Sequence, residues 1–113
     1  MPTTIQRVAI LGAAGAIGRS TGAELRRRGI PFRAVGRDGK KLEGAFSGQA
    51  EIRAADINNP DQTARALEGC DTAIYAVGLP YPEHKLHPVL MRTAIDAMRR
   101  AGVSRMALSS SVY

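Results

Sequence analysis

Short apolar runs alternate along the chain with longer stretches in which apolar residues recur at helical spacing. Apolar runs bounded by glycine, proline or charged residues are typical of strands buried in a sheet. These runs predict strands at 7–11, 32–36, 51–56, 71–77 and 103–109. The stretches between them predict four helices. The first begins after the glycines at 12–18 and ends at Gly29, and the second spans 42–46. The third begins at 60 and ends at Gly69, and the fourth spans 86–101.

Residues at the predicted helix ends support these boundaries. Gly29 suits the left-handed cap of the first helix, and Pro31 prevents that helix from continuing. The segment 59–62, Asn-Pro-Asp-Gln, supplies an N-cap, a proline at the first helical position and a capping glutamine. Residues 37–41, which follow the second strand, are expected to form a polar turn with a dense positive charge.

Strands that alternate with helices predict an α/β fold, a doubly wound parallel sheet with helices on both faces. Right-handed crossovers that start from the first strand give the spatial strand order 3-2-1-4-5. Residues 1–113 are expected to belong to one domain, because no linker, repeat or low-complexity block interrupts them.

Glycines at 12, 15 and 18 separate the first strand from the first helix. A strand, a glycine turn and a helix form the context in which dinucleotide phosphates bind. Gly12 allows a tight turn, Gly15 lets a pyrophosphate approach the backbone, and Gly18 lets helix and strand pack closely. The N–H groups and positive dipole end of the helix would then face the phosphates. The alternative is a glycine-rich turn that serves only helix packing.

Arg37 follows the second strand, where many NAD enzymes place an acid that binds the adenosine ribose hydroxyls. A guanidinium instead suits a 2′-phosphate, which its planar fork of donors can grip. Arg37 therefore favours NADP over NAD. Asp38 follows immediately and could still reach a ribose, so NAD stays open, and a solvated basic turn is a third interpretation.

The composition is ordinary for a soluble globular protein, with 44% apolar and 23% charged residues. No apolar run approaches the ~20 residues of a membrane span, and residues 1–4 do not begin a signal peptide. We therefore expect a cytoplasmic protein with no membrane partner. Cys70 is the single cysteine, and we expect it to be a small structural residue.

The net charge of +6 could indicate a nucleic-acid partner. The arginines are scattered, however, apart from those at 26–28, where cations complement the dipole of the first helix. The few aromatic residues lack the interleaving of a stacking platform. These features disfavour nucleic acid. His84 and His87 have no other ligand type clustered with them, so no metal is expected.

The glycine spacing, with its flanking strand and helix, resembles the short-chain dehydrogenase/reductase superfamily in its extended or atypical branch. The resemblance implies a Rossmann-like fold that binds NADP, the preferred cofactor, or NAD. The cofactor contacts that it implies lie near the strand ends, at Gly12, Ala14, Gly15, Ala16, Ile17, Gly18, Arg37, Asp56, Ile57, Ala76, Val77 and Gly78. The residues alone allow Asp56 another role, the capping of a turn before Asn58 and Asn59.

The closing residues 109–113, Ser-Ser-Ser-Val-Tyr, resemble the end of the fifth strand in extended members, where a serine hydrogen-bonds a substrate hydroxyl or carbonyl. Ser110 and Ser111 are the catalytic candidates, spacing does not choose between them, and a polar strand end is the alternative. The segment 81–85 fits the family's Tyr-x-x-x-Lys pattern. Pro82 interrupts it and the segment precedes the fifth strand, so we do not expect it to be the catalytic dyad.

The resemblance covers nearly the whole chain but only the N-terminal half of the family's domain. The sheet is therefore expected to be truncated after the fifth strand, with the catalytic helix and substrate lobe absent and this chain alone inactive. The expected function is the NAD(P)-binding portion of an epimerase, dehydratase or reductase that transfers a hydride at an oxygen-bearing carbon of a small molecule. The alternatives are a regulatory NADP sensor without turnover and, less favoured, a basic nucleic-acid binder. The oligomeric state stays open.

Overall fold

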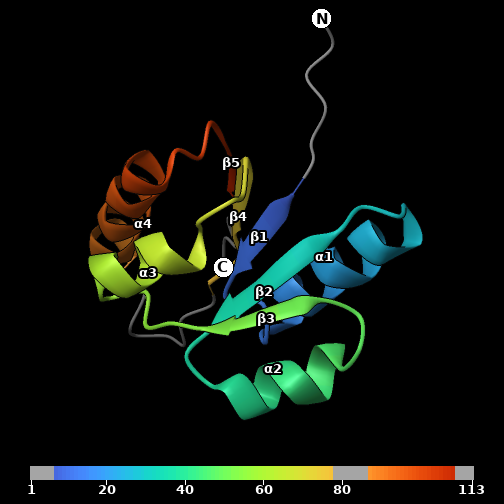
Figure 1. Cartoon of the computed structure of the whole chain (residues 1–113). Helices are drawn as coiled ribbons and strands as arrows, with labels where there is room; N and C mark the ends of the chain where they lie inside the picture. The colour runs from blue at the N-terminus through green and yellow to red at the C-terminus, as the bar shows by residue number, and fades with distance from the viewer. Residues whose placement is uncertain (1–6, 78–86, 109–113) are drawn as a thin grey trace, which may run out of the picture.

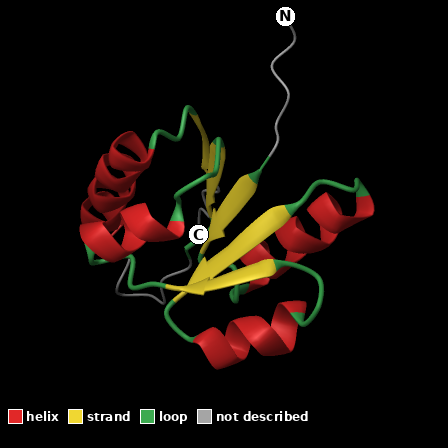
Figure 2. Ribbon diagram, in the orientation of Figure 1, coloured by secondary structure: helices red, strands yellow, loops and turns green. Residues whose placement is uncertain are grey.

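The computed structural model describes residues 7–77 and 87–108, in which one parallel sheet lies between two pairs of helices (Figures 1 and 2). The strands of these residues are β1 (Val8–Leu11), β2 (Phe32–Gly36), β3 (Glu51–Ala54), β4 (Thr72–Tyr75) and β5 (Arg105–Leu108). The helices are α1 (Ala16–Arg27), α2 (Gly39–Phe46), α3 (Pro60–Ala66) and α4 (His87–Ala101). Within the same residues, no helix has the length and apolar character that a membrane crossing requires.

The spatial order of the strands is β3-β2-β1-β4-β5, and every neighbouring pair is parallel. The predicted fold class and strand order are therefore confirmed. In the central strand β1, Leu11 is in register with Val35 on one side and with Tyr75 on the other. Because parallel strands end at the same edge of a sheet, the turn after β1 lies at the middle of the edge where such folds bind ligands.

Strand β1 is buried on both faces, as its unbroken apolar run predicts. Ala9 and Leu11 belong to the core cluster formed with α3 and α4, whereas Val8 and Ile10 belong to the cluster formed with α2. Figure 1 shows α3 and α4 on one face of the sheet and α1 and α2 on the other. The alternation of side chains along β1 thus joins the two halves of the core.

Helix α1 lies close to its neighbours because it carries a glycine where they meet. A Cβ at Gly22 would stand 2.6 Å from Cε1 of Phe46 and 3.1 Å from Cζ of Phe32. The two phenyl rings pack edge to face, with centroids 5.5 Å apart and an interplanar angle of 80°. Gly22 is therefore needed for the packing of α1 against α2 and β2.

The prediction of a polar turn over residues 37–41 is wrong, because helix α2 begins at Gly39 rather than at residue 42. The carboxylate of Asp38 accepts hydrogen bonds from the N–H groups of Lys40 at 3.0 Å and Lys41 at 3.2 Å. This N-cap stabilises a helical turn in a stretch whose composition resembles a loop.

Gln62 is a capping residue at the start of α3, as predicted, but its side chain does not bind the N–H of the N-cap residue Asn59. Asn59 Oδ1 accepts from the Gln62 N–H at 3.1 Å, as an N-cap does. The Gln62 side chain reaches back past Asn59 and accepts from the Asp56 N–H at 3.0 Å. The start of α3 is thereby tied to the segment that leaves β3.

Candidate functional site

The turn between β1 and α1 requires glycine at position 12. Gly12 has a φ of +81°, a left-handed conformation that disfavours other residues. A Cβ there would also stand 2.7 Å from the Val77 Cα and 2.9 Å from the Ala76 carbonyl oxygen. The structure therefore brings three predicted site residues together at the carboxyl edge of the sheet.

Position 18 requires glycine for packing alone. A Cβ at Gly18 would stand 2.6 Å from the Ala13 Cα and 2.7 Å from the Ala13 carbonyl oxygen, and it would also collide with the Gly12 carbonyl oxygen. The first turn of α1 can thus lie against the backbone of the glycine turn only without a side chain here. This is the close packing expected of the third glycine.

The turn itself does not require glycine at position 15. Gly15 is exposed, with φ of −75° and ψ of 173°, an extended conformation open to any residue. A Cβ there would meet only the Gly12 carbonyl oxygen, at an ordinary 3.6 Å. Among the described residues, no atom therefore crowds a side chain at position 15.

Helix α1 begins without a capping side chain. Its N-cap is Gly15, whereas the N-caps of α2 and α3 are Asp38 and Asn59, whose side chains accept from first-turn N–H groups. The N–H groups that open α1 have no acceptor within the helix. They and the positive end of the helix dipole favour an anion at this place. Ala16 and Ile17 form the exposed first turn, and Ile17 is 39% exposed.

The glycine turn is tied to the neighbouring strands by backbone hydrogen bonds. The N–H groups of Gly12 and Ala13 both donate to the Val35 carbonyl oxygen, at 3.0 and 3.1 Å. The Ala76 N–H donates to the Leu11 carbonyl oxygen at 2.8 Å. The carboxyl ends of β1, β2 and β4 are thus held together around the turn.

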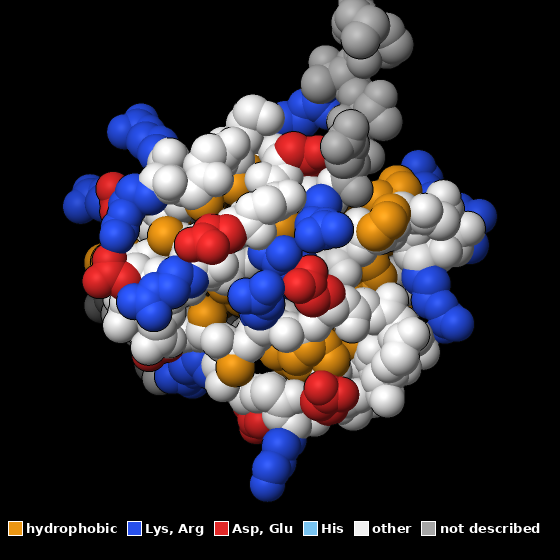
Figure 3. Space-filling view, in the orientation of Figure 1, with side chains coloured by type: hydrophobic (Ala, Val, Ile, Leu, Met, Phe, Trp, Pro, Cys, Tyr) orange, Lys and Arg blue, Asp and Glu red, His pale blue; other side chains and the backbone are white. Residues whose placement is uncertain are grey.

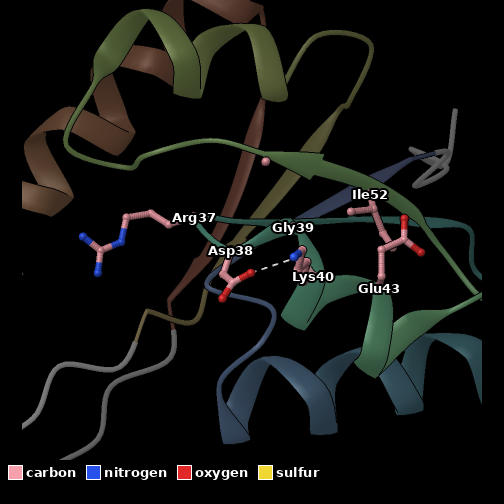
Figure 4. Close-up of a pocket in the computed structure, with 7 residues that line it drawn as sticks. Arg37, Asp38, Gly39, Lys40, Glu43 and Ile52 are labelled. Carbon is pink, nitrogen blue, oxygen red and sulfur yellow. Dashed lines mark hydrogen bonds between the residues drawn. The ribbon is translucent and has the colours of Figure 1, made fainter.

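Arg37 is exposed directly after β2, beside an open hollow of about 800 Å³. The lining residues of this hollow are Arg37, Asp38, Gly39, Lys40, Glu43, Ile52 and Ala54. Figure 4 shows the Arg37 side chain extending away from Glu43 and Ile52, while Asp38 is turned to Lys40 as the cap of α2. The guanidinium thus lies at the carboxyl end of β2 and is not engaged by the acids of this hollow.

A second hollow, of about 350 Å³, lies between the glycine turn, α1 and α2. It is lined by Ala14 from the turn, Arg19 from α1, and Lys41, Gly44 and Ala45 from α2. This hollow is smaller than the one beside Arg37, but it adjoins the glycine turn, where the start of α1 favours an anion. Of these lining residues, Ala14 is a predicted site residue, whereas Arg19, which directly follows Gly18, is not.

Asp56 and Ile57 leave the carboxyl end of β3. Asp56 Oδ1 accepts from the Asn58 N–H at 2.9 Å, so the turn-capping role that the sequence allowed is present. Ile57 is partly buried against the core cluster formed with α3 and α4. Their contact with a cofactor stays a prediction.

Several predicted positions lie outside the described residues. They are Gly78, the candidate catalytic residues Ser110 and Ser111, and Tyr81, His84 and Lys85. Among the described residues, no group of three or more His, Cys, Asp or Glu side chains could hold a metal ion. On the face shown in Figure 3, Lys and Arg side chains are interspersed with acids rather than gathered in one patch.

Comparison with solved structures gives the same architecture. A Burkholderia pseudomallei protein proposed to be exported is 30% identical over 93% of this chain, with a TM-score of 0.77. A proposed epimerase from Bacteroides thetaiotaomicron is 25% identical over 93% of the chain, with a TM-score of 0.78. An NADPH-dependent quinone oxidoreductase from Escherichia coli, solved with NADPH, shares the fold at 24% identity over 91% of the chain and a TM-score of 0.76.

This chain covers 47%, 47% and 36% of those three proteins, so it spans half of their length or less. Comparison with curated proteins gives no match. A family model described as NAD(P)H-binding matches residues 12–113, from the first glycine of the turn onward. With that match, the Rossmann-like strand order and the glycine turn at the central strand, the chain belongs to the NAD(P)H-binding family.

Proposed function

We propose that this chain is the N-terminal, cofactor-binding part of an epimerase, dehydratase or reductase that uses NADP in preference to NAD. The family fixes a nicotinamide dinucleotide as the cofactor class. Such a cofactor donates or accepts a hydride at its nicotinamide ring. In this proposal the substrate is a small molecule with an oxygen-bearing carbon, and Ser110 or Ser111 binds that oxygen.

Gly15 is the observation that carries the proposal. Gly12 and Gly18 are explained by the protein's own backbone, but among the described residues no φ value and no close contact explains glycine at position 15. A pyrophosphate that approaches the backbone supplies the missing reason, because any side chain would occupy its place. The uncapped start of α1 offers the same ligand N–H donors and a favourable dipole.

The preference for NADP rests on the end of β2. Arg37 is exposed there and points away from the acids of its hollow. One carboxylate oxygen of Asp38 already accepts two backbone N–H groups of α2, which leaves the residue less able to bind ribose hydroxyls. Lys40 and Lys41 add positive charge near the same place, and phosphate is the group that this charge favours.

Substitution of Gly15 tests the proposed cofactor site. Valine fits the extended backbone of Gly15, so the free energy of unfolding of Gly15→Val should stay within about 1 kcal/mol of wild type. Calorimetric titration with NADPH should show binding weakened roughly tenfold to a hundredfold, because phosphate contacts are lost. Ala23→Val, at an exposed position of the same helix, is the matched control and should bind normally. Equal affinity of Gly15→Val and wild type would show that the turn serves only packing.

A further inference from the structure

Among the residues that the structure describes, the hollow between the glycine turn and α2 is lined by two cations and by no acid. Arg19 reaches it from α1 and Lys41 from α2, and its other lining residues are glycine or alanine. The hollow beside Arg37, by contrast, has Asp38 and Glu43 in its lining. An anion is therefore attracted more strongly to the hollow of Arg19 and Lys41.

The small residues of this hollow keep it open rather than pack it. A Cβ at Gly44 would meet no atom within 4 Å, and Gly44 has no positive φ. Glycine in the interior of α2 lowers helix stability relative to alanine, so neither packing nor backbone conformation explains it. Gly44 thus resembles Gly15 in that, among the described residues, neither a close contact nor a positive φ explains the glycine.

Arg19 lies one helical turn after Gly15. The Arg19 N–H donates to the Gly15 carbonyl oxygen at 2.9 Å, which places the two residues on the same side of α1. A pyrophosphate at Gly15 and an adenosine ribose at the end of β2 would therefore have this hollow between them. A charged group on the ribose would enter it.

We infer that Arg19 is a second residue that selects NADP, holding the 2′-phosphate from the α1 side while Lys41 holds it from α2. This inference rests on the proposed function, because it uses the cofactor position given there. Arg19 donates from a planar fork of N–H groups, which matches phosphate oxygens.

The test compares Arg19→Gln with Arg26→Gln, which removes the same charge from the exposed last turn of α1. Calorimetric titrations with NADPH and with NADH give the two affinities for each variant. Arg19→Gln should weaken NADPH binding by about threefold to tenfold and leave NADH binding unchanged. Arg26→Gln should leave both unchanged, and Arg19→Lys, which keeps the charge, should retain most of the NADPH affinity.

The outcomes separate this inference from the proposed function. If wild type binds NADPH and Arg19→Gln binds it equally well, Arg19 has no role and the inference is wrong, while the cofactor site stands. If Arg19→Gln weakens NADPH and NADH equally, Arg19 serves the pyrophosphate and the 2′-phosphate assignment is wrong. If wild type binds neither cofactor, the proposed function fails and this inference fails with it.

Discussion

The guanidinium of Arg33, buried in β2, donates from Nε to Oε1 of Glu51 on β3 at 2.9 Å. Its Nη1 also donates to the carbonyl oxygens of Ala66 at 2.7 Å and Glu68 at 2.6 Å, where α3 ends. Arg33 is only 2% exposed, so these bonds supply the partners that a buried cation needs. One side chain thus joins two strands to the C-terminal end of a helix, where positive charge is favoured.

The ion pair of Arg33 predicts a stability that depends on pH. The hydrogen bond from Arg33 is the main reason why the pKa of Glu51 lies below its ordinary value of 4.5. A lowered pKa in the folded state adds stability that is complete above the unfolded pKa and is lost as pH falls through the folded pKa. Glu51→Gln should therefore cost about 1 kcal/mol at pH 7, a small value because the Glu51 side chain is 41% exposed.

Urea unfolding at pH 7 and at pH 3 measures this difference. The difference in the free energy of unfolding between wild type and Glu51→Gln should shrink at pH 3, because the pH has then fallen below 4.5 and towards the lowered pKa of the folded state. Glu43→Gln, an exposed glutamate on α2, is the control and should differ little from wild type at either pH. A gap that widened towards pH 3 would contradict the assignment.

Gly18→Ala should lower the free energy of unfolding, because position 18 packs directly against the backbone of the glycine turn. The new Cβ would collide with the backbone of Gly12 and Ala13, which cannot move without moving β1. Overpacking of this kind costs about 1–3 kcal/mol. Thermal unfolding measures the loss, and Gly29→Ala, where φ is +71° but no atom lies within 4 Å, separates a steric cost from a conformational one. If Gly18→Ala unfolded at the same temperature as wild type, α1 would have to be able to shift away from the turn, which would contradict this prediction.

Arg37→Ala should weaken NADPH binding by roughly tenfold to a hundredfold and leave NADH binding nearly unchanged. The reason is the loss of a charge-assisted contact to the 2′-phosphate that NADH lacks. Calorimetry with both cofactors measures the effect, with Arg65→Ala on the exposed side of α3 as the control for net charge. Equal weakening of both cofactors would assign Arg37 to the fold or the pyrophosphate. A preference of wild type for NADH would assign the ribose to Asp38.

Cys70 should react slowly with thiol reagents while the chain is folded. The thiol is 5% exposed, and its burial raises its pKa, ahead of the smaller lowering effects of Arg33 and Arg7. Less thiolate and less access both slow the reaction. Labelling at pH 8 with and without urea measures the rates, and a folded rate equal to the unfolded one would contradict this structural role.

The fold could be predicted because its signals are local. The apolar run of β1 and the glycines that follow it determine the centre of the sheet, and the alternation of elements gives the strand order. The roles of Gly12 and Gly18 also follow from their places in the turn. These inferences need only the order of residues along the chain.

Features that depend on distant partners could not be predicted in this way. Arg33 was correctly expected in a strand, but its burial depends on Glu51 and on carbonyl groups more than thirty residues away. Arg19 shares its hollow with Lys41, Gly44 and Ala45 of α2, which are distant from it in the sequence. The early start of α2 was missed because the charges of its first turn hid the cap that Asp38 provides.

The Val35 carbonyl oxygen, which accepts from both Gly12 and Ala13, has a mechanical consequence. Val35 lies two residues before Arg37, so its carbonyl oxygen ties the glycine turn to the end of β2, directly before Arg37. The backbone of the turn is thus held against the end of β2 without a ligand, which lowers the ordering cost that binding would have to meet. In the proposed site, this peptide group therefore sets the span between the pyrophosphate and the adenosine end of the cofactor before the cofactor binds.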